Sequence, residues 1–275
     1  MSAPLVALTV AGSDPSGGAG VQADLKTFSA LGAYGTAVLT ALTAQSTLGV
    51  TGVHAVPAEF VAEQLATLTA DVRVDAVKIG MLARRDVVEV VGEFLRTWDA
   101  AGGRVVVLDP VMVATSGDQL VADDAVAAIR DLLPRARLVT PNLPEAARLL
   151  EEPVVGDLDG MLAQAERLRG LGAAWVLLKG GHLTGPQAVD VLVGPDGAHV
   201  LPGPRVDTVH THGTGCTLSS AVAVLAARLG GWPAAASSAK TWLTGALRAA
   251  DGLRVGGGSG PVHHFHELWA AGRVP

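Results

Sequence analysis

The chain has 275 residues, of which 49% are hydrophobic and 17% charged, and its formal net charge is -6. That length and apolar content suffice for a large buried core, and the absence of a basic patch or run disfavours nucleic acid as a partner. A single cysteine excludes an intramolecular disulfide and fits a reducing compartment. No apolar stretch approaches the length of a membrane span, and the apolar N-terminus has no Lys or Arg before Lys26, so we expect a cytoplasmic protein without a signal peptide.

Apolar runs and amphipathic segments alternate through the first half of the chain. The first apolar run is followed by a glycine-rich loop, Gly12–Gly20. Proline suits the first turn of a helix, so Pro57 is expected to open the second helix. The spacing of apolar residues predicts strands at 5–10, 34–44, 76–79 and 104–108, and helices at 21–31, from Pro57 onward and at 86–98.

The second half continues this alternation and adds a hairpin signal. The segment Gly194–Gly197 lies between two short apolar runs, 189–193 and 199–201, which predicts a β-hairpin. Glycines at 256–260 predict a flexible tail. Other strands are expected at 138–139 and 175–178, and helices at 123–133, 158–171, 217–229 and 233–250.

The alternation of strands and helices indicates the fold class. Several strands are uniformly apolar, which is typical of a mostly parallel sheet covered on both faces. We therefore expect a three-layer α/β/α sandwich in which residues 1–275 form one domain. A barrel of eight parallel strands is the competing architecture, but the late hairpin and the final pair of helices fit it badly.

One stretch, from His212 to Cys216, combines glycines with the only cysteine and leads directly into an alanine-rich helix. Such a helix start presents unpaired amides and a partial positive charge, which suit a phosphate or an oxyanion. A thiol in that setting is expected to have a lowered pKa. The alternative interpretation is an ordinary glycine turn with Cys216 as a small buried hydrophobe, and this segment alone does not separate the two.

Polar residues follow several of the predicted strands, where ligands bind in open α/β sheets. Together they supply carboxylates, an amide, a lysine and a glycine loop, a set suited to phosphoryl transfer from a magnesium nucleotide. These strand ends carry Gly12–Gly20, Gln45, Gly80–Met81, Asp109, Asn142 with Glu145, and Lys179–Gly181.

Three other patterns carry less weight. The segment Gly18–Ala23 matches a loose dinucleotide-binding pattern, but after Asp24 the next acidic residue is Glu59, so the required acid about 20 residues on is missing. No Walker A sequence occurs, which excludes a P-loop kinase. The histidines of His263–His266 have no recognised metal-ligand spacing, so a structural role or a solvated tail is expected.

The motifs taken together resemble one family. The chain is similar to the bifunctional hydroxymethylpyrimidine/phosphomethylpyrimidine kinases of thiamine biosynthesis, within the ribokinase-like superfamily, from about Leu5 to Trp269. Even the closing segment Gly260–His266 matches. The segments that carry the resemblance are Ala11–Gly20, Gln22–Thr27, Lys78–Met81, Thr140–Ala146, Lys179–His182 and His212–Thr217.

The resemblance implies a ribokinase-like fold, ATP and Mg²⁺ as cofactors, and a homodimer. It also implies two successive transfers, first to 4-amino-5-hydroxymethyl-2-methylpyrimidine and then to its monophosphate. By position it assigns the pyrimidine pocket to Gly12, Asp24, Thr43, Gln45 and Met81. It assigns metal binding to Asp109 and Glu145, nucleotide contacts to Asn142, Lys179 and Thr214, and the catalytic anion hole to Gly213, Thr214, Gly215 and Cys216, with Cys216 beside the acceptor hydroxyl.

Some alternatives stay open. Ser46 stands where many members of the family have Asn, which affects loop contacts near the ring. Pyridoxal kinase is the nearest alternative function, because its substrate is also a flat hydroxymethyl heterocycle. A non-catalytic pyrimidine-binding protein belongs to another class, and the nucleotide-binding residues argue against it. The polar loop 114–118 is a candidate lid or an ordinary surface loop.

Overall fold

The computed structural model describes residues 3–113, 117–118, 120–181 and 183–270. Its central sheet has the strand order β10-β9-β8-β7-β6-β5-β1-β2. Neighbours from β2 to β8 pair in parallel, whereas β9 pairs antiparallel with β8 and β10. The strands are β1 (Val6–Ala11), β2 (Tyr34–Leu39), β5 (Ala76–Ile79), β6 (Val105–Leu108), β7 (Leu138–Val139), β8 (Trp175–Leu178), β9 (Asp190–Gly194) and β10 (Gly197–Leu201). The mostly parallel sheet and the hairpin at Gly194–Gly197 are confirmed.

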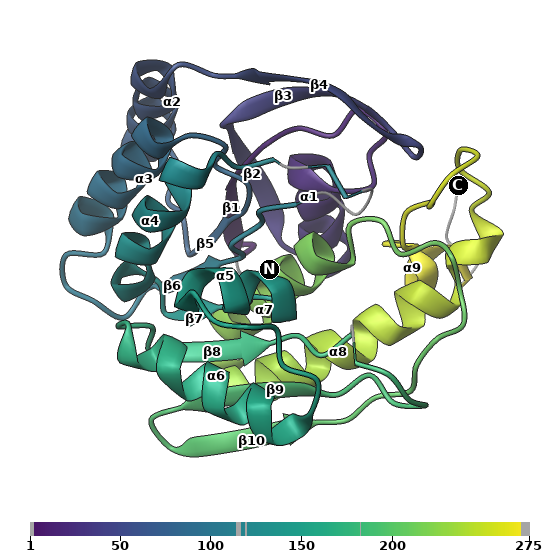
Figure 1. Ribbon diagram of the computed structural model, residues 1–275. Helices are drawn as coiled ribbons and strands as arrows, with labels where there is room; N and C mark the ends of the chain where they lie inside the picture. Colours follow the sequence, from purple (N-terminus) through teal and green to yellow (C-terminus); the bar gives the residue numbers. More distant parts are fainter. Residues whose placement is uncertain (1–2, 114–116, 119, 182, 271–275) are drawn as a thin grey trace.

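Helices cover both faces of this sheet, which confirms the three-layer sandwich (Figure 1). One face carries α2 (Ala58–Asp71), α3 (Arg85–Trp98), α4 (Asp123–Leu132), α5 (Leu143–Leu150) and α6 (Leu158–Gly170). The other face carries α1 (Gly20–Ala30), α7 (Thr214–Leu229) and α8 (Trp232–Arg248). Short helical turns lie at η1 (Leu133–Arg135), η2 (Ala250–Gly252) and α9 (His266–Ala270).

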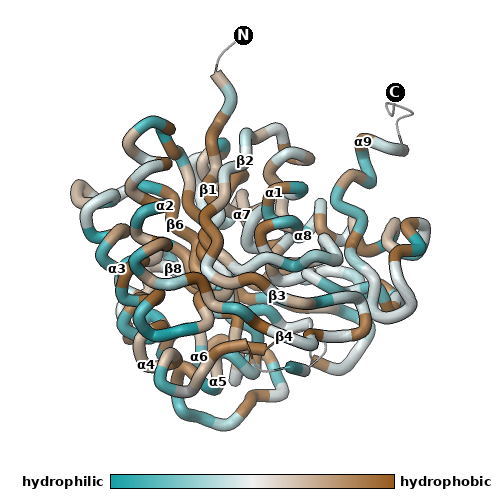
Figure 2. Tube along the Cα trace, turned by 90° about the horizontal axis from the view of Figure 1, so that it is seen from above, coloured by the Kyte–Doolittle hydropathy of each residue, from teal (hydrophilic) through white to brown (hydrophobic). Residues whose placement is uncertain are grey.

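Alternate residues of the central strands enter opposite cores, because successive side chains of a strand point to opposite faces. On β6, Val107 packs in the core formed with α7 and α8, whereas Val106 and Leu108 pack in the core on the other face. Figure 2 shows the hydrophobic colouring concentrated along these strands, between the helices. A strand buried on both faces has little alternation of polarity, which is why the sequence showed uniform apolar runs.

The strand predicted at 34–44 is wrong as a single element. The chain leaves the main sheet after β2, and the hairpin of β3 (Ala41–Ser46) and β4 (Gly49–Ala55) forms a separate two-stranded sheet (Figure 1). At the bend, Thr40 donates its amide to Ala11 O at 3.0 Å and its hydroxyl to Met81 O at 2.6 Å. These contacts are tertiary, and no glycine or proline marks the bend in the sequence.

The segment 256–260 also differs from the expected flexible tail, because it packs against two other segments. Gly258 N donates to Thr47 Oγ1 at 3.2 Å, and His212 N donates to Gly260 O at 3.1 Å. The tip of the β3–β4 hairpin and the approach to α7 are therefore both bonded to this C-terminal segment. Within the described ranges, no helix is long and apolar enough to span a membrane.

Candidate active site

A cavity of about 650 Å³ opens at the carboxyl ends of the parallel strands and extends to the start of α7. The structure brings nearly every residue of the predicted site to its wall. The lining includes Gly12, Thr43, Gln45, Met81, Asp109, Asn142, Glu145, Lys179, Gly213, Thr214, Gly215 and Cys216. Asp24 alone of the predicted set is not part of the lining. Of the candidate lid, residues 114–116 lie outside the described residues, and Asp118 accepts a hydrogen bond from Val50 N at 3.1 Å.

The start of α7 has the backbone geometry of an anion-binding helix terminus. Gly213 occupies the N-cap position at φ 75°, in the left-handed region that favours glycine. A Cβ on Gly213 would lie 1.8 Å from Gly18 O, so the two glycine-rich loops touch at this point. Among the described residues no side chain caps the first turn. Thr214 N donates to Thr211 O at 3.2 Å, so the amides of Gly215 and Cys216 are the ones that this turn offers to a ligand in the cavity.

A buried carboxylate joins the two loops that meet there. Asp14 Oδ2 contacts His212 Nε2 at 2.7 Å and accepts from Ala19 N at 2.8 Å, while Asp14 Oδ1 accepts from Ser16 N at 2.9 Å. Burial alone would raise the pKa of Asp14, but hydrogen bonds from His212 and Ser16 and the charge of His212 lower it. Neither Asp14 nor His212 was predicted to have a role, although both lie within the motifs that carry the family resemblance.

Two carboxylates and a lysine form the charged wall of the cavity. Lys179 Nζ lies 2.8 Å from Asp109 Oδ1 and 3.9 Å from Glu145 Oε2. Asp109 is also held by the Thr140 hydroxyl at 3.0 Å and the Ser219 hydroxyl at 3.3 Å. Each of the three charged residues follows or adjoins the end of a parallel strand, so the sheet places them together as expected.

Local helix capping positions the second carboxylate. Asn142 Oδ1 accepts from Glu145 N at 2.8 Å, and Glu145 Oε2 accepts from Asn142 N at 2.8 Å, which is a complete capping box at the start of α5. No helix was predicted here, although the spacing of Asn142 and Glu145 and the proline between them are helix-start signals. Glu145 is thus fixed by a reciprocal hydrogen bond as well as by its charged neighbours.

The two carboxylates have different proton affinities. Burial raises the pKa of Glu145 to about 7, with the charge of Asp109 adding to the increase and Lys179 opposing it. Burial also acts to raise the pKa of Asp109, but the charges of Lys179 and Lys78 lower it overall. Asp109 is therefore the carboxylate that stays ionised, and Glu145 is the one that a further cation would bring into its charged form.

The two carboxylates of Asp109 and Glu145 suit Mg²⁺ better than they suit a cation whose ligands must all come from the protein. Within the described parts of the chain, no group of three or more His, Cys, Asp or Glu could hold a metal. Mg²⁺ commonly takes one or two carboxylates and completes its shell with water and phosphate oxygens. Asp109 and Glu145 supply hard oxygens facing a cavity large enough for a nucleotide phosphate.

Among the histidines near the C-terminus, His264 is buried and contacts Thr217 Oγ1 at 3.1 Å, and burial lowers its pKa to about 3.

The opposite end of the cavity is more apolar. Met81 is 8% exposed, and a Cβ on Gly12 would lie 2.3 Å from Met81 Cε, so any larger residue at position 12 would displace the end of this methionine side chain. The Thr43 hydroxyl lies 2.8 Å from Ser13 O and 3.0 Å from Gln45 Oε1. A side-chain amide that both donates and accepts, next to an adaptable thioether, can bind the edge and the face of a flat heterocycle.

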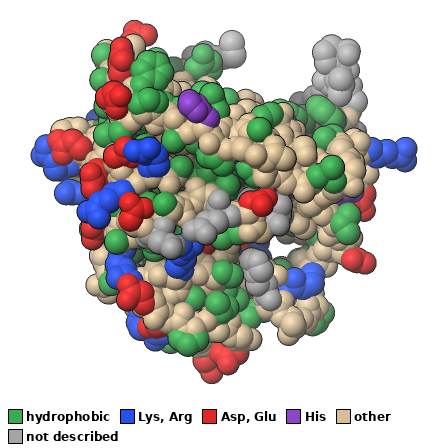
Figure 3. Space-filling view, turned by 45° about the horizontal axis from the view of Figure 1, so that its top comes forward, with side chains coloured by type: hydrophobic (Ala, Val, Ile, Leu, Met, Phe, Trp, Pro, Cys, Tyr) green, Lys and Arg blue, Asp and Glu red, His purple; other side chains and the backbone are tan. Residues whose placement is uncertain are grey.

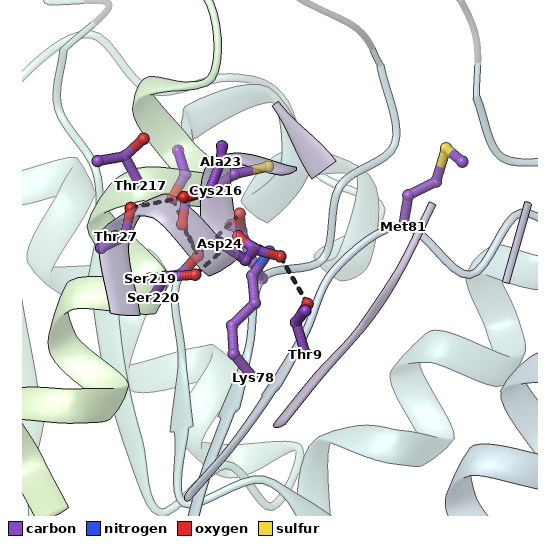
Figure 4. A network of polar contacts seen from close by, with 12 residues as sticks. Thr9, Ala23, Asp24, Thr27, Lys78, Met81, Cys216, Thr217, Ser219 and Ser220 are labelled. Carbon is purple, nitrogen blue, oxygen red and sulfur yellow. Dashed lines mark hydrogen bonds and ion pairs between the residues drawn. The ribbon is translucent and has the colours of Figure 1, made fainter. Parts of the chain in front are cut away.

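Asp24 lies behind this wall instead of facing the cavity. Its side chain is fully buried, and Lys78 Nζ donates to both of its oxygens at 2.9 Å. The Thr9 and Ser220 hydroxyls donate to it at 2.6 and 2.7 Å (Figure 4). The protein itself satisfies the carboxylate oxygens of Asp24, because Lys78, Thr9 and Ser220 all donate to them. The sequence gave no signal for this partner beyond a lysine inside an apolar strand.

The expectation of a lowered Cys216 pKa is wrong. Burial raises the pKa of Cys216 to about 11, and the charges of Asp24 and Asp109 add to the increase while Lys78 opposes it. A helix start favours a thiolate, but desolvation and two carboxylates outweigh that effect here. The thiol is partly buried at the cavity wall and is protonated at neutral pH.

The end of the cavity next to α8 was missed by sequence analysis. Lys240 and Asp190 form an ion pair there, and Asp190 Oδ1 also accepts from Gly180 N at 2.9 Å. Arg205 donates to Gly181 O at 2.9 Å and to Gly185 O at 2.8 Å, which holds the loop after β8. These residues lie singly in the sequence and only the fold brings them together, so no motif could have indicated them.

Comparison with known proteins places these features in one family. The family model for phosphomethylpyrimidine kinase matches residues 14–263. A hydroxymethylpyrimidine/phosphomethylpyrimidine kinase of Salmonella typhimurium is 53% identical and covers 96% of this chain and 98% of its own length. A protein of the same name from Rhizobium meliloti is 51% identical, with 96% of this chain and 98% of the relative covered.

Solved structures agree with the sequence matches on the fold. The ADP complex of Bacillus subtilis pyridoxal kinase has a TM-score of 0.87 at 35% identity and covers 99% of this chain and 100% of its own. Phosphomethylpyrimidine kinase from Clostridium difficile has a TM-score of 0.76 at 38% identity, covering 87% and 98%. Staphylococcus aureus pyridoxal kinase in complex with AMP-PCP and pyridoxal has a TM-score of 0.87 at 31% identity, covering 97% and 95%.

Proposed function

Because the chain belongs to the phosphomethylpyrimidine kinase family, we propose that it uses ATP to phosphorylate 4-amino-5-hydroxymethyl-2-methylpyrimidine and then the resulting monophosphate. The observation that carries the proposal is the single cavity, which joins a pocket for a flat heterocycle to a phosphate-binding helix start. Apart from Thr43, Gln45 and Asp109, the residues assigned to the two ends lie in the segments that carry the family resemblance.

The acceptor occupies the end lined by Gly12, Gln45 and Met81. The Gln45 amide pairs with the amino group and a ring nitrogen of the pyrimidine, and Met81 contacts the ring face. The hydroxymethyl oxygen then faces the start of α7. In this arrangement the acceptor is held by shape and hydrogen bonds, which suits a substrate that is neutral in the first transfer.

The phosphates of ATP occupy the charged end. The amides of Gly213, Gly215 and Cys216 stabilise the charge on the equatorial oxygens of the transferred group, and Lys179 contacts the nucleotide phosphates. Asn142 and Thr214 complete the nucleotide contacts. Asp109 and Glu145 would hold Mg²⁺, which supplies charge neutralisation and orientation of the phosphates.

Cys216 contributes contact and position more than basicity. A thiol with a pKa of about 11 is a donor at neutral pH and does not accept the hydroxyl proton before transfer. A loose phosphoryl-transfer transition state places little charge on the nucleophile, so a strong base is not required. The amides of the helix start therefore carry more of the catalysis than the sulfur.

A second activity, phosphorylation of pyridoxal, is favoured by a specific observation. Pyridoxal kinases of Bacillus subtilis and Staphylococcus aureus superpose over nearly the whole chain. The curated relatives with higher identity, however, are named for the pyrimidine, which favours it as the main acceptor.

We further propose a homodimeric cytoplasmic enzyme whose whole length forms one domain. Light scattering coupled to gel filtration would test the dimer.

Mass spectrometry of the products tests the function directly. The protein is incubated with the hydroxymethylpyrimidine, ATP and Mg²⁺, and parallel reactions contain pyridoxal or no acceptor. We expect the monophosphate first and the diphosphate later, with a higher initial rate than for pyridoxal. Product from pyridoxal alone would assign the chain to pyridoxal kinase, and no product from either acceptor would support a binding protein.

A further inference from the structure

The glycine-rich segment Gly256–Gly260 lies against the tip of the β3–β4 hairpin (Figure 1). Gly258 N donates to Thr47 Oγ1 at 3.2 Å. A Cβ on Gly258 would lie 2.1 Å from Thr47 O, and a Cβ on Gly256 would lie 2.2 Å from Thr47 Oγ1. A Cβ on Gly257, by contrast, would meet no heavy atom of the described residues within 4 Å. The two glycines that face the hairpin therefore permit a close approach that a larger residue would prevent.

The same segment is bonded to the loop that enters α7. Gly260 N donates to His210 Nδ1 at 3.0 Å, and Gly260 O accepts from His212 N at 3.1 Å. Ser259 Oγ donates to Val209 O at 2.8 Å. Because His212 directly precedes the N-cap of α7, the segment is fixed relative to the phosphate end of the cavity. From that position it holds the tip of the hairpin.

The hairpin needs such an anchor because it lies outside the main sheet. A two-stranded sheet on its own is only marginally stable in water. The base of the hairpin is held by the Thr43 hydroxyl, which donates to Ser13 O at 2.8 Å. The register of β3 against β4 shifts between Ala44 and Gln45, and such an irregularity disrupts the ladder of hydrogen bonds locally. Gln45 thus lies between a contact at the base and a contact at the tip, and both are needed to fix its position.

The tip of the hairpin is outside the cavity, whereas its middle forms part of the cavity wall. Among the described residues, Thr43 and Gln45 line the cavity, but Thr47 and Gly256–Gly260 do not. We propose that Gly256–Gly260 is a positioning segment, which holds the hairpin at the acceptor end of the cavity and thereby sets the affinity for the pyrimidine without contacting it. The effect on pyrimidine binding rests on the proposed function, and the anchoring of the hairpin does not.

Gly258→Ala tests the anchoring, because its methyl group would collide with the backbone of Thr47 and no change of rotamer relieves that contact. Hydrogen exchange of the free protein is followed by mass spectrometry of peptides that cover residues 46–51 and, as an internal reference, β6. Local opening of the hairpin raises exchange there without raising it in the core. We expect about tenfold faster exchange at 46–51 in Gly258→Ala and no change in β6.

Calorimetric titration with the hydroxymethylpyrimidine and, separately, with AMP-PCP and Mg²⁺ tests the effect on binding. The apparent affinity for the pyrimidine falls with the fraction of molecules in which the hairpin is in place. We expect about tenfold weaker pyrimidine binding in Gly258→Ala, which corresponds to about one molecule in ten with the hairpin in place, and unchanged AMP-PCP binding. Thr47→Val keeps the shape of the side chain but lacks the hydroxyl, and it should show the same pattern with a loss of about threefold.

Gly257→Ala is the matched control, because its Cβ would enter open space, and it should change neither exchange nor affinity. Unchanged exchange at 46–51 in Gly258→Ala would overturn the anchoring, and faster exchange with unchanged pyrimidine binding would overturn the effect on affinity. Equal losses for both ligands, or faster exchange in β6 as well, would show a general loss of structure and contradict the proposal.

Exchange needs no ligand, which separates this proposal from the proposed function. A parent protein that bound neither the pyrimidine nor AMP-PCP would count against the kinase activity, and the exchange of Gly258→Ala would still decide whether the segment anchors the hairpin. Normal binding by the parent with no difference in Gly258→Ala would overturn the positioning role and leave the kinase proposal intact.

Discussion

At the scale of single residues, the surroundings of Cys216 and Asp24 determine what these side chains can do chemically. That could not be inferred from the residue types alone. Both were assigned by position within motifs, and the motifs correctly placed Cys216 at the cavity wall. The sequence could not show that Lys78 would be buried against Asp24, or that burial and the charges of Asp24 and Asp109 would raise the pKa of the thiol. Proton affinities depend on such tertiary neighbours, so they were the least predictable property of the site.

The raised pKa of Cys216 changes what its replacement should do. We expect Cys216→Ser to keep nucleotide binding and to lose less than the roughly 10²-fold that removing a general base usually costs. The parent should show no rise in turnover between pH 7 and 9 attributable to this thiol. Steady-state rates of both proteins across that pH range would check this. A loss of about 10⁴-fold, with a pH-dependent limb that disappears in the serine variant, would restore the general-base role.

Glu145 is expected to act through a metal ion. Its pKa of about 7 reflects burial next to Asp109, and a divalent cation held by these carboxylates would favour the charged form. We expect Glu145→Gln to lower turnover by at least about tenfold and to raise the Mg²⁺ concentration needed for half-maximal rate. Mg²⁺ titrations of the initial rate would measure both. Glu166→Gln on the exposed face of α6 is the control, and equal titrations for parent and Glu145→Gln would remove Glu145 from the site.

At the scale of elements, predictability followed the length and burial of each segment. The parallel strands and long helices were predicted because uniform apolar runs and helical spacing extend over several residues. The break between β2 and β3 was missed because tertiary hydrogen bonds at Thr40, not local turn residues, make the bend. Helix α5 was missed because it is short, although its capping box was visible in the sequence. Loop-to-loop contacts such as Asp14 with His212 span most of the chain and leave no local pattern.

The link between the β1–α1 loop and the start of α7 should contribute measurably to stability. Asp14→Asn leaves buried donors, His212 among them, without their charged acceptor, and we expect a loss of about 1–3 kcal/mol in the free energy of unfolding at pH 7. Because the pKa of Asp14 is lowered in the folded state, its contribution is present above its ordinary pKa and is lost as pH falls through the lowered value.

Urea unfolding of the parent and Asp14→Asn at several pH values measures this contribution. The difference between the two proteins should be largest near pH 7 and should shrink toward pH 3. A difference that grows on acidification would show that Asp14 is not stabilised as a carboxylate. Asp196→Asn, in the exposed turn between β9 and β10, is a control that should change stability little at any pH.

At the scale of the whole molecule, the sheet separates two cores and places one cavity at its carboxyl edge. Acidic and basic side chains are interspersed on the face shown in Figure 3, which agrees with a small-molecule substrate more than with a polyanion. Residues far apart in the sequence, such as Asp109 and Lys179, line the same cavity because each follows a parallel strand and these strands end on the same side of the sheet. Because of this topological rule, the residues that line the site could be predicted from the sequence more completely than their protonation.

The proposed function requires that the cavity has a heterocycle end and a phosphate end, and calorimetric titration of Gln45→Leu tests this division most directly. The hydroxymethylpyrimidine and AMP-PCP with Mg²⁺ are titrated separately into the parent and the variant. We predict that pyrimidine binding weakens by about 1–3 kcal/mol, the cost of an unsatisfied buried polar group, while AMP-PCP binding stays unchanged. Equal binding of both ligands to parent and variant, or an equal loss of both, would contradict the account.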